Sequence, residues 1–145
     1  MKPFLGVLAL LTAAPCLAGT DFGTEAEAKG MAEALVAIID AEGLDAARTA
    51  MFQSDRAFRL SPMGINLFQG SVLIADNREP ETVSADYAKI IDLNGENAWA
   101  LIEQAAAGPG DALLRWYHYD TQDEYLYHCY SLRAHRDEAL VMVCR

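Results

Sequence analysis

The chain has 145 residues, of which 52% are apolar and 22% charged, and its formal net charge is −10. This length allows one compact domain and excludes two packed domains, and the apolar fraction is too high for a disordered tail. Because 11 Lys and Arg residues stand against 21 Asp and Glu residues, the composition argues against a surface that follows nucleic-acid phosphates. We therefore expect no nucleic-acid partner.

The first residues have the pattern of a secretory signal peptide. Lys2 supplies a positive charge, residues 4–14 form an apolar run, and small residues stand at the expected cleavage site. We predict a signal peptide over residues 1–18, cleaved after Ala18, with cleavage after Gly19 as the alternative. A second alternative is a lipidated cysteine at position 16, although a proline stands where a lipobox has a small residue.

The predicted mature chain, residues 19–145, reads as a single domain. The apolar run of the signal peptide is too short to span a bilayer, and no later stretch approaches the required length. We therefore predict no membrane span and a stand-alone, exported protein that is periplasmic or secreted.

A long amphipathic helix is predicted at the start of the mature chain. Thr24 and Glu27 form a capping box, and apolar residues recur at helical spacing over residues 31–39. Gly43 is expected to end this helix, because glycine readily adopts the left-handed conformation at a helix C-terminus. A second, shorter helix is expected over residues 45–53, and a loop follows it.

A β-hairpin and then a helical insertion are predicted in the middle of the chain. The hairpin joins residues 65–68 to residues 72–75 through a turn that contains Gly70. The insertion has two stretches of helical pattern, over residues 82–91 and 96–107, separated by a turn that contains glycine.

Three further strands are predicted after the insertion, over residues 112–119, 124–132 and 139–144. This element order predicts an α+β fold. In it, a long N-terminal helix precedes a five-stranded antiparallel sheet with a helical insertion.

A disulfide is predicted within the last hairpin. Removal of the signal peptide leaves Cys129 and Cys144, an even pair in an oxidising compartment. If residues 135–138 form the hairpin loop, Ala134 pairs with Ala139 and the two cysteines lie directly opposite each other. Opposed residues of antiparallel strands are close enough to be bridged, so we predict the disulfide. The alternative is two free, buried thiols.

Three segments occur in a characteristic order: INLFQGSVLIADN, then DLNG before a helix, then the strands ALLRWYHY and YLYHCYSL. This order resembles the single Cache domain, a PAS-like extracytoplasmic sensor domain. Asp92 begins a turn that looks like the family's D-x-x-G turn, and Trp116-Tyr117-His118 looks like its aromatic strand. The resemblance covers nearly the whole mature chain. It implies a pocket between sheet and insertion for a carboxylate, an amino acid or an amine.

Aromatic side chains are concentrated on the two strands that follow the insertion. With a loop over residues 120–123, Trp116 lies opposite Tyr127, and His118 lies opposite Tyr125. These four side chains then share one sheet face with the disulfide. Apolar rings with polar tips are suited to a small-ligand pocket, and we predict all four as ligand-binding residues. The alternative is ordinary sheet packing, since Tyr and Trp favour strands.

A further candidate ligand-binding residue is Tyr87, and Phe68, Asp76 and Asn77 are weaker candidates of the same kind. Tyr87 lies in the insertion that is expected to cover the pocket. Arg115 has a guanidinium that matches a carboxylate, although strand alternation places it on the face away from Trp116. Arg56 and Arg59 precede the sheet and could reach the pocket mouth, with simple surface exposure as the alternative.

The sequence favours neither an enzyme nor a cofactor or metal site. His118 and His128 fall on opposite sheet faces and His135 lies in a turn, so no two histidines have metal-ligand spacing. No phosphate-binding loop, dinucleotide motif or HExxH motif is present.

Two functions remain after these exclusions. In the first, the protein binds a small polar metabolite in the periplasm and presents it to a membrane sensor kinase or transporter. In the second, it is a non-enzymatic structural or protein-interaction module whose pocket is filled by its own side chains. The Ala-rich, amphipathic N-terminal helix would also permit a homodimer.

Overall fold

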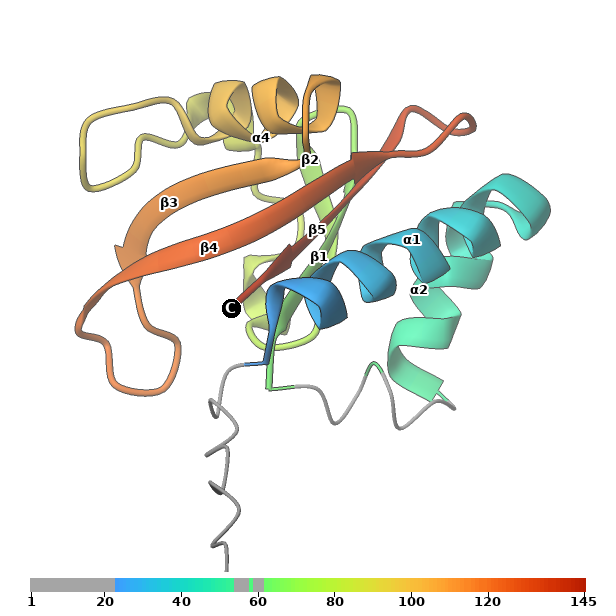
Figure 1. Ribbon diagram of the computed structural model, residues 1–145, viewed down its shortest axis with the longest axis horizontal. Helices are drawn as coiled ribbons and strands as arrows, with labels where there is room; N and C mark the ends of the chain where they lie inside the picture. Colours follow the sequence, from blue (N-terminus) through green and yellow to red (C-terminus); the bar gives the residue numbers. More distant parts are fainter. Residues whose placement is uncertain (1–22, 54–57, 59–61) are drawn as a thin grey trace, which may run out of the picture.

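The computed structural model describes residues 23–53, 58 and 62–145, in which helices precede a five-stranded antiparallel sheet with strand order β2-β1-β5-β4-β3 (Figure 1). This architecture confirms the predicted α+β fold. The predicted signal peptide and the candidates Arg56 and Arg59 lie outside the described residues. The elements are α1 (Glu25–Glu42), α2 (Leu44–Gln53), β1 (Gly64–Gln69), β2 (Val72–Asp76), η1 (Pro80–Thr82), η2 (Tyr87–Lys89), α4 (Ala98–Ala107), β3 (Asp111–Tyr117), β4 (Glu124–Arg133) and β5 (Ala139–Cys144).

The helix α1 begins and ends where its sequence signals indicate. The Glu27 N–H donates to Thr24 Oγ1 at 3.2 Å, and the Thr24 N–H donates to Glu27 Oε2 at 2.7 Å. At the other end, the Gly43 N–H donates to the Ile39 carbonyl at 2.8 Å. The φ of Gly43 is +97°, a conformation that glycine adopts without strain.

Helices cover both faces of the sheet (Figure 1). On one face, α1 and α2 pack over an apolar core that includes Leu35, Ile65 and Val141. On the other face, α4 packs over a second core that includes Phe68 and Leu140. All six residues of β5 are buried because this strand is central and has a core on each side.

The register of β4 and β5 is as predicted. Cys129 lies opposite Cys144, and the Ala134 N–H donates to the Ala139 carbonyl at 2.9 Å to close the hairpin. The predicted disulfide is present, and the two Cα atoms that it links are 4.0 Å apart. The last strand is therefore covalently attached to its neighbour.

The register of β3 and β4 differs from the prediction by two residues. The sequence predicts Trp116 opposite Tyr127, and His118 opposite Tyr125. In the structure, Trp116 lies opposite Tyr125, and Leu114 lies opposite Tyr127. Because the difference is an even number of residues, each side chain that stays within β3 or β4 remains on the sheet face predicted for it.

The different register arises at His118, which leaves the strand and organises a longer turn than the predicted one. Its N–H donates to the Asp123 carbonyl at 2.8 Å. Its Nδ1 accepts from the backbone N–H groups of Asp120 at 3.2 Å and Thr121 at 3.4 Å. Gln122 has a φ of +60° within this turn. These hydrogen bonds replace the β3–β4 residue pairs beyond Tyr117 that the predicted loop over residues 120–123 would have allowed.

The first half of the insertion is not the predicted helix over residues 82–91. It contains η1 and η2, and the chain between them pairs with the edge strand β2. The Leu73 N–H donates to the Ala85 carbonyl at 2.9 Å, and the Ser84 N–H donates to the Leu73 carbonyl at 2.7 Å. Ser84 has a φ of +81°, which no α-helix can contain. Pairing with the sheet edge therefore replaces the helix.

The loop between β4 and β5 contacts the C-terminal end of α1 through Asp40. The His135 N–H donates to Asp40 Oδ1 at 2.7 Å, and His135 Nδ1 lies 2.8 Å from Asp40 Oδ2. The hydrogen bond to Asp40 raises the pKa of His135 above its ordinary value of 6.5. The same side-chain hydrogen bond lowers the pKa of Asp40 below its ordinary value of 3.8.

We expect the Asp40–His135 pair to stabilise the fold mainly between pH 3.8 and pH 6.5. Its contribution is lost as the pH rises through the raised pKa of His135, and it is also lost as the pH falls through the lowered pKa of Asp40. The melting temperature of His135→Gln should therefore fall below that of the wild type most clearly in this window. The exposed His128→Gln is the control, and a deficit that did not vary with pH would contradict the assignment.

Candidate ligand-binding site

A cavity of about 170 Å³ lies between the sheet and the insertion. Its floor is the sheet face that carries Leu114 and Met142, and its opposite wall is formed by insertion residues that include Tyr87 and Ile90. An apolar cavity of about 150 Å³ can hold one benzene molecule. The space is therefore suited to a single small organic molecule.

Aromatic side chains form much of the cavity wall. Those in the lining are Tyr87, Trp116, Tyr117, Tyr119 and Tyr127, so three of the predicted aromatic site residues (Tyr87, Trp116 and Tyr127) line this space. The Tyr127 hydroxyl donates to the Tyr117 carbonyl at 3.4 Å. Burial raises the pKa of Tyr127 and of Tyr87 to about 12, so both phenols stay protonated near neutral pH.

Three other predicted site residues lie behind the cavity wall. Phe68 is fully buried, and its ring centroid is 4.8 Å from that of Tyr87 and 5.4 Å from that of Trp99. The His118 ring lies 5.2 Å from the Tyr125 ring. The Tyr125 ring packs edge-on at 4.8 Å from the ring of Tyr127. Phe68, His118 and Tyr125 therefore support the side chains that line the cavity.

Arg115 lies away from the cavity. Its side chain is 50% exposed and its Nε is 3.8 Å from Glu124 Oε2. Arg115 and Trp116 lie on opposite faces of β3, as strand alternation predicts.

The polar end of the cavity is organised by Asp76, at the end of β2. Asp76 Oδ1 accepts from the backbone N–H groups of Arg78 at 2.7 Å and Glu79 at 2.8 Å. Asp76 Oδ2 accepts from Asn66 Nδ2 at 2.7 Å and from the Thr82 hydroxyl at 3.5 Å. These hydrogen bonds fix the chain that turns from β2 into η1.

The sequence indicates Asp76 only as a weak candidate and does not point to Asn66, Arg78, Glu79 or Thr82, and all five residues line the cavity. The available signal was the turn after β2. An Asp whose side chain accepts from the backbone N–H groups two and three residues later is typical of an Asx turn. The contact with Asn66 depends on the pairing of β1 with β2 and has no signal in the local sequence.

Arg78 and Tyr119 lie together at the polar end. The Arg78 guanidinium carbon is 5.1 Å from the centroid of the Tyr119 ring, a cation–π arrangement. The Tyr119 hydroxyl donates to the Pro62 carbonyl at 3.0 Å. Arg78 is therefore engaged with the aromatic wall.

Asp92 occupies another part of the cavity wall and belongs to the DLNG turn. Its carboxylate accepts from the backbone N–H groups of Asn94 at 2.9 Å, Glu96 at 3.0 Å and Arg115 at 3.3 Å. Burial opposes ionisation, but these hydrogen bonds outweigh it and lower the pKa of Asp92. The carboxylate is therefore used to hold the turn against the edge strand β3.

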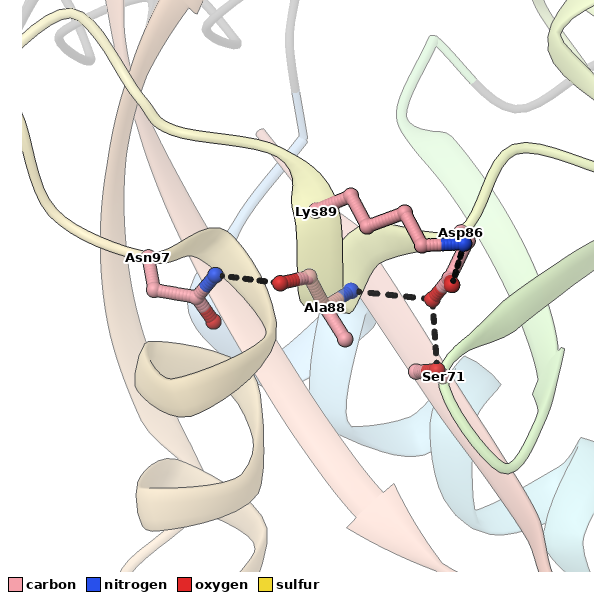
Figure 2. Close-up of polar contacts among 5 residues, drawn as sticks. All are labelled: Ser71, Asp86, Ala88, Lys89 and Asn97. Carbon is pink, nitrogen blue, oxygen red and sulfur yellow. Dashed lines mark hydrogen bonds and ion pairs between the residues drawn. The ribbon is translucent and has the colours of Figure 1, made fainter.

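Hydrogen bonds fix η2, the segment that carries Tyr87 (Figure 2). Asp86 Oδ1 accepts from the Ser71 hydroxyl at 2.7 Å and from the Ala88 N–H at 3.2 Å. The Lys89 ammonium is 2.9 Å from Asp86 Oδ2, and Asn97 Nδ2 donates to the Ala88 carbonyl at 2.9 Å. The insertion is thus tied both to the β1–β2 turn and to the start of α4, which holds Tyr87 over the cavity.

Two further features of the described residues bear on the kind of site. Among residues 23–53, 58 and 62–145, no group of three or more His, Cys, Asp or Glu residues has an arrangement suited to a metal ion. Over the same residues, no helix has the length and apolar character that crossing a membrane requires.

No protein-family model and no curated protein matches the sequence. Solved structures do share its fold. A methyl-accepting chemotaxis protein from Vibrio parahaemolyticus aligns with a TM-score of 0.63 at 15% identity, over 83% of this chain and 86% of the other. A periplasmic sensor domain of a chemotaxis protein aligns with a TM-score of 0.58 at 16% identity, over 81% and 86%.

A third solved structure is a Cache chemosensory domain described for carboxylic acid recognition. It aligns with a TM-score of 0.55 at 13% identity, over 81% of this chain and 84% of the other. All three structures contain sensor or chemotaxis domains, and each matches most of both chains. The described residues therefore have the fold of a single Cache-like sensor domain, as their element order indicates.

Proposed function

We propose that this protein is a sensor-type domain that binds one small organic molecule in the cavity between its sheet and its insertion. The observation that carries the proposal is the cavity of about 170 Å³, which the chain's own side chains leave between Tyr87 and the aromatic wall of β3 and β4. A pocket filled by the chain itself, the alternative considered from the sequence, would leave no such space. Apolar walls with a few fixed polar groups are typical of small-molecule sites.

The proposal includes export and presentation of the ligand to a membrane protein. The signal-peptide pattern over residues 1–18 and the Cys129–Cys144 disulfide support a mature chain of residues 19–145 in an oxidising compartment. In this account the ligand-loaded domain contacts a membrane sensor kinase or transporter and has no catalytic role. A homodimer through α1 remains a prediction.

A thermal-shift screen of the oxidised mature protein tests the proposal. The panel contains small carboxylates, amino acids and amines, and a ligand that binds the folded state raises the melting temperature by mass action. We expect one chemical class to raise it in proportion to the logarithm of ligand concentration. A flat response to every class would contradict the proposal.

Trp116→Ala is expected to remove the ligand-induced rise in melting temperature. The Trp116 side chain lines the cavity but is 38% exposed, so its loss should leave the fold intact. Leu113→Ala is the matched control, since Leu113 is on the same strand, faces the other side and is 53% exposed. An unchanged ligand response in Trp116→Ala would remove Trp116 from the site.

A further inference from the structure

The cavity lining contains more negatively than positively charged side chains. The lining contains the carboxylates of Asp76, Glu79 and Asp92 and the guanidinium of Arg78. Hydrogen bonds from the surrounding turns occupy Asp76 and Asp92, and Arg78 lies over the ring of Tyr119. Glu79 is the third carboxylate of the lining, and none of these hydrogen bonds involves its side chain.

Within residues 23–53, 58 and 62–145, no hydrogen bond or ion pair reaches the side chain of Glu79. Burial, together with the neighbouring carboxylates of Asp76 and Glu81, raises the pKa of Glu79. A half-buried carboxylate without a partner is costly to maintain, and a cation placed beside it would remove that cost.

The negative charge of Glu79 acts across the cavity. Besides burial, the charges of Asp76 and Glu79 contribute to the raised pKa of Tyr87. The charge of Glu79 also contributes to the raised pKa of Tyr127, which lies on the sheet. Two phenols on different walls are therefore within the field of the same carboxylate.

We infer that the cavity selects a small ligand with one ammonium group, which pairs with Glu79 while its apolar part lies against Trp116. This inference rests on the proposed function and assigns its ligand class. Aromatic faces attract cations, and the lining combines several such rings with the unpaired carboxylate. A carboxylate ligand would instead meet like charge, because the lining contains three carboxylates (Asp76, Glu79 and Asp92) and one guanidinium, that of Arg78.

The volume limits the size of this ligand. A space of about 170 Å³ exceeds only slightly the roughly 150 Å³ that holds benzene. The apolar part of the ligand should therefore be no larger than a short alkyl chain or a single ring. We use n-pentylammonium as the probe, with pentan-1-ol and pentanoate as neutral and anionic analogues of similar shape.

Calorimetric titration of the oxidised mature protein with these three probes tests the inference. We expect n-pentylammonium to bind at least about tenfold more tightly than pentan-1-ol, and pentanoate to bind most weakly. Glu79→Gln should weaken n-pentylammonium binding by at least about tenfold and leave pentan-1-ol binding unchanged. Glu81→Gln is the matched control, since Glu81 is an exposed carboxylate nearby that does not line the cavity.

Glu79→Gln should also fold at least as well as the wild type. Because the pKa of Glu79 is raised on folding, its ionised form destabilises the folded state above that raised pKa. The ligand-free variant should therefore melt slightly higher than the wild type at neutral pH. This difference should vanish as the pH falls below the ordinary glutamate value of 4.5.

The outcomes separate the inference from the proposed function. If pentanoate or pentan-1-ol binds more tightly than n-pentylammonium and Trp116→Ala abolishes that binding, the ammonium assignment is overturned and the binding function stands. Equal n-pentylammonium affinity in the wild type and Glu79→Gln would overturn the role of Glu79. If neither these probes nor any compound of the thermal-shift panel binds, the proposed function fails and the inference fails with it.

Discussion

Phe68→Ala is expected to lower the free energy of unfolding by about 3–5 kcal/mol. The Phe68 side chain is fully buried, and its ring lies 4.8 Å from that of Tyr87 and 5.4 Å from that of Trp99. Truncation would leave a void between β1, η2 and α4 that a close-packed interior cannot fill without strain. Urea unfolding of the oxidised protein, followed by far-ultraviolet circular dichroism, measures the loss.

The same substitution should also affect the cavity, because the Phe68 ring packs edge-on against the ring of Tyr87, which lines the cavity. Phe52→Ala is the matched control, since Phe52 lies on α2 and is 39% exposed. We expect the control to change the free energy of unfolding by less than about 1 kcal/mol. A Phe68→Ala protein as stable as the Phe52→Ala protein would show that the ring does not carry the packing assigned to it.

Removing the disulfide should have the second large effect. The double variant Cys129→Ala, Cys144→Ala is expected to lose about 3 kcal/mol of stability, because the bridge closes a loop with a sequence separation of 15. The bridge attaches β5 to β4, and β5 is the central strand on which both cores pack. Its loss should therefore weaken both layers of the fold.

Mass spectrometry without reductant provides the direct check on the bridge, since the oxidised chain is two hydrogens lighter than the reduced chain. Unfolding of the wild type in the presence of reductant is the control for the double variant. Both should show a similarly lowered midpoint. Equal midpoints for the oxidised wild type and the double variant would contradict a stabilising role for the disulfide.

Features specified by neighbouring residues could be predicted from the sequence. The capping box at Thr24 and Glu27 involves residues within one helical turn. The Cys129–Cys144 pairing follows from the length of one short hairpin loop. In both cases the contacts lie close together in the chain, so residue types and spacing determine the geometry.

The errors arose where distant contacts or a particular side chain decide the backbone. His118 lengthens the turn after β3 by accepting two backbone hydrogen bonds, which shifts the strand register. The segment around Ser84 has a helical pattern but pairs instead with β2, an edge strand that offers unpaired backbone groups.

The candidate site likewise has one part that the sequence predicts and one part that it does not. Strand alternation placed Trp116 and Tyr127 on one face, and both line the cavity. The polar end was missed because it depends on Asp76 meeting Asn66 across two strands and on the turn that follows. Glu79 has no signal in the local sequence, because the role proposed for it depends on its side chain having no hydrogen-bond or ion-pair partner among residues 23–53, 58 and 62–145.

The central claim is that a small molecule occupies the space beneath Tyr87. The chain has two Trp residues, so indole N–H signals in a proton–nitrogen correlation spectrum report on two positions. Trp116 lines the cavity, whereas Trp99 is 9% exposed in the core beneath α4 and serves as an internal reference.

Titration of the oxidised mature protein with n-pentylammonium should be followed in this spectrum. The account predicts saturable shifts of the Trp116 indole, of the Asn66 side-chain amide and of the backbone amides of η2, with the signals of α2 unchanged. A spectrum unaffected by the probe and by the compounds of the thermal-shift panel would contradict it. So would shifts confined to the opposite sheet face around Leu113 and Leu126.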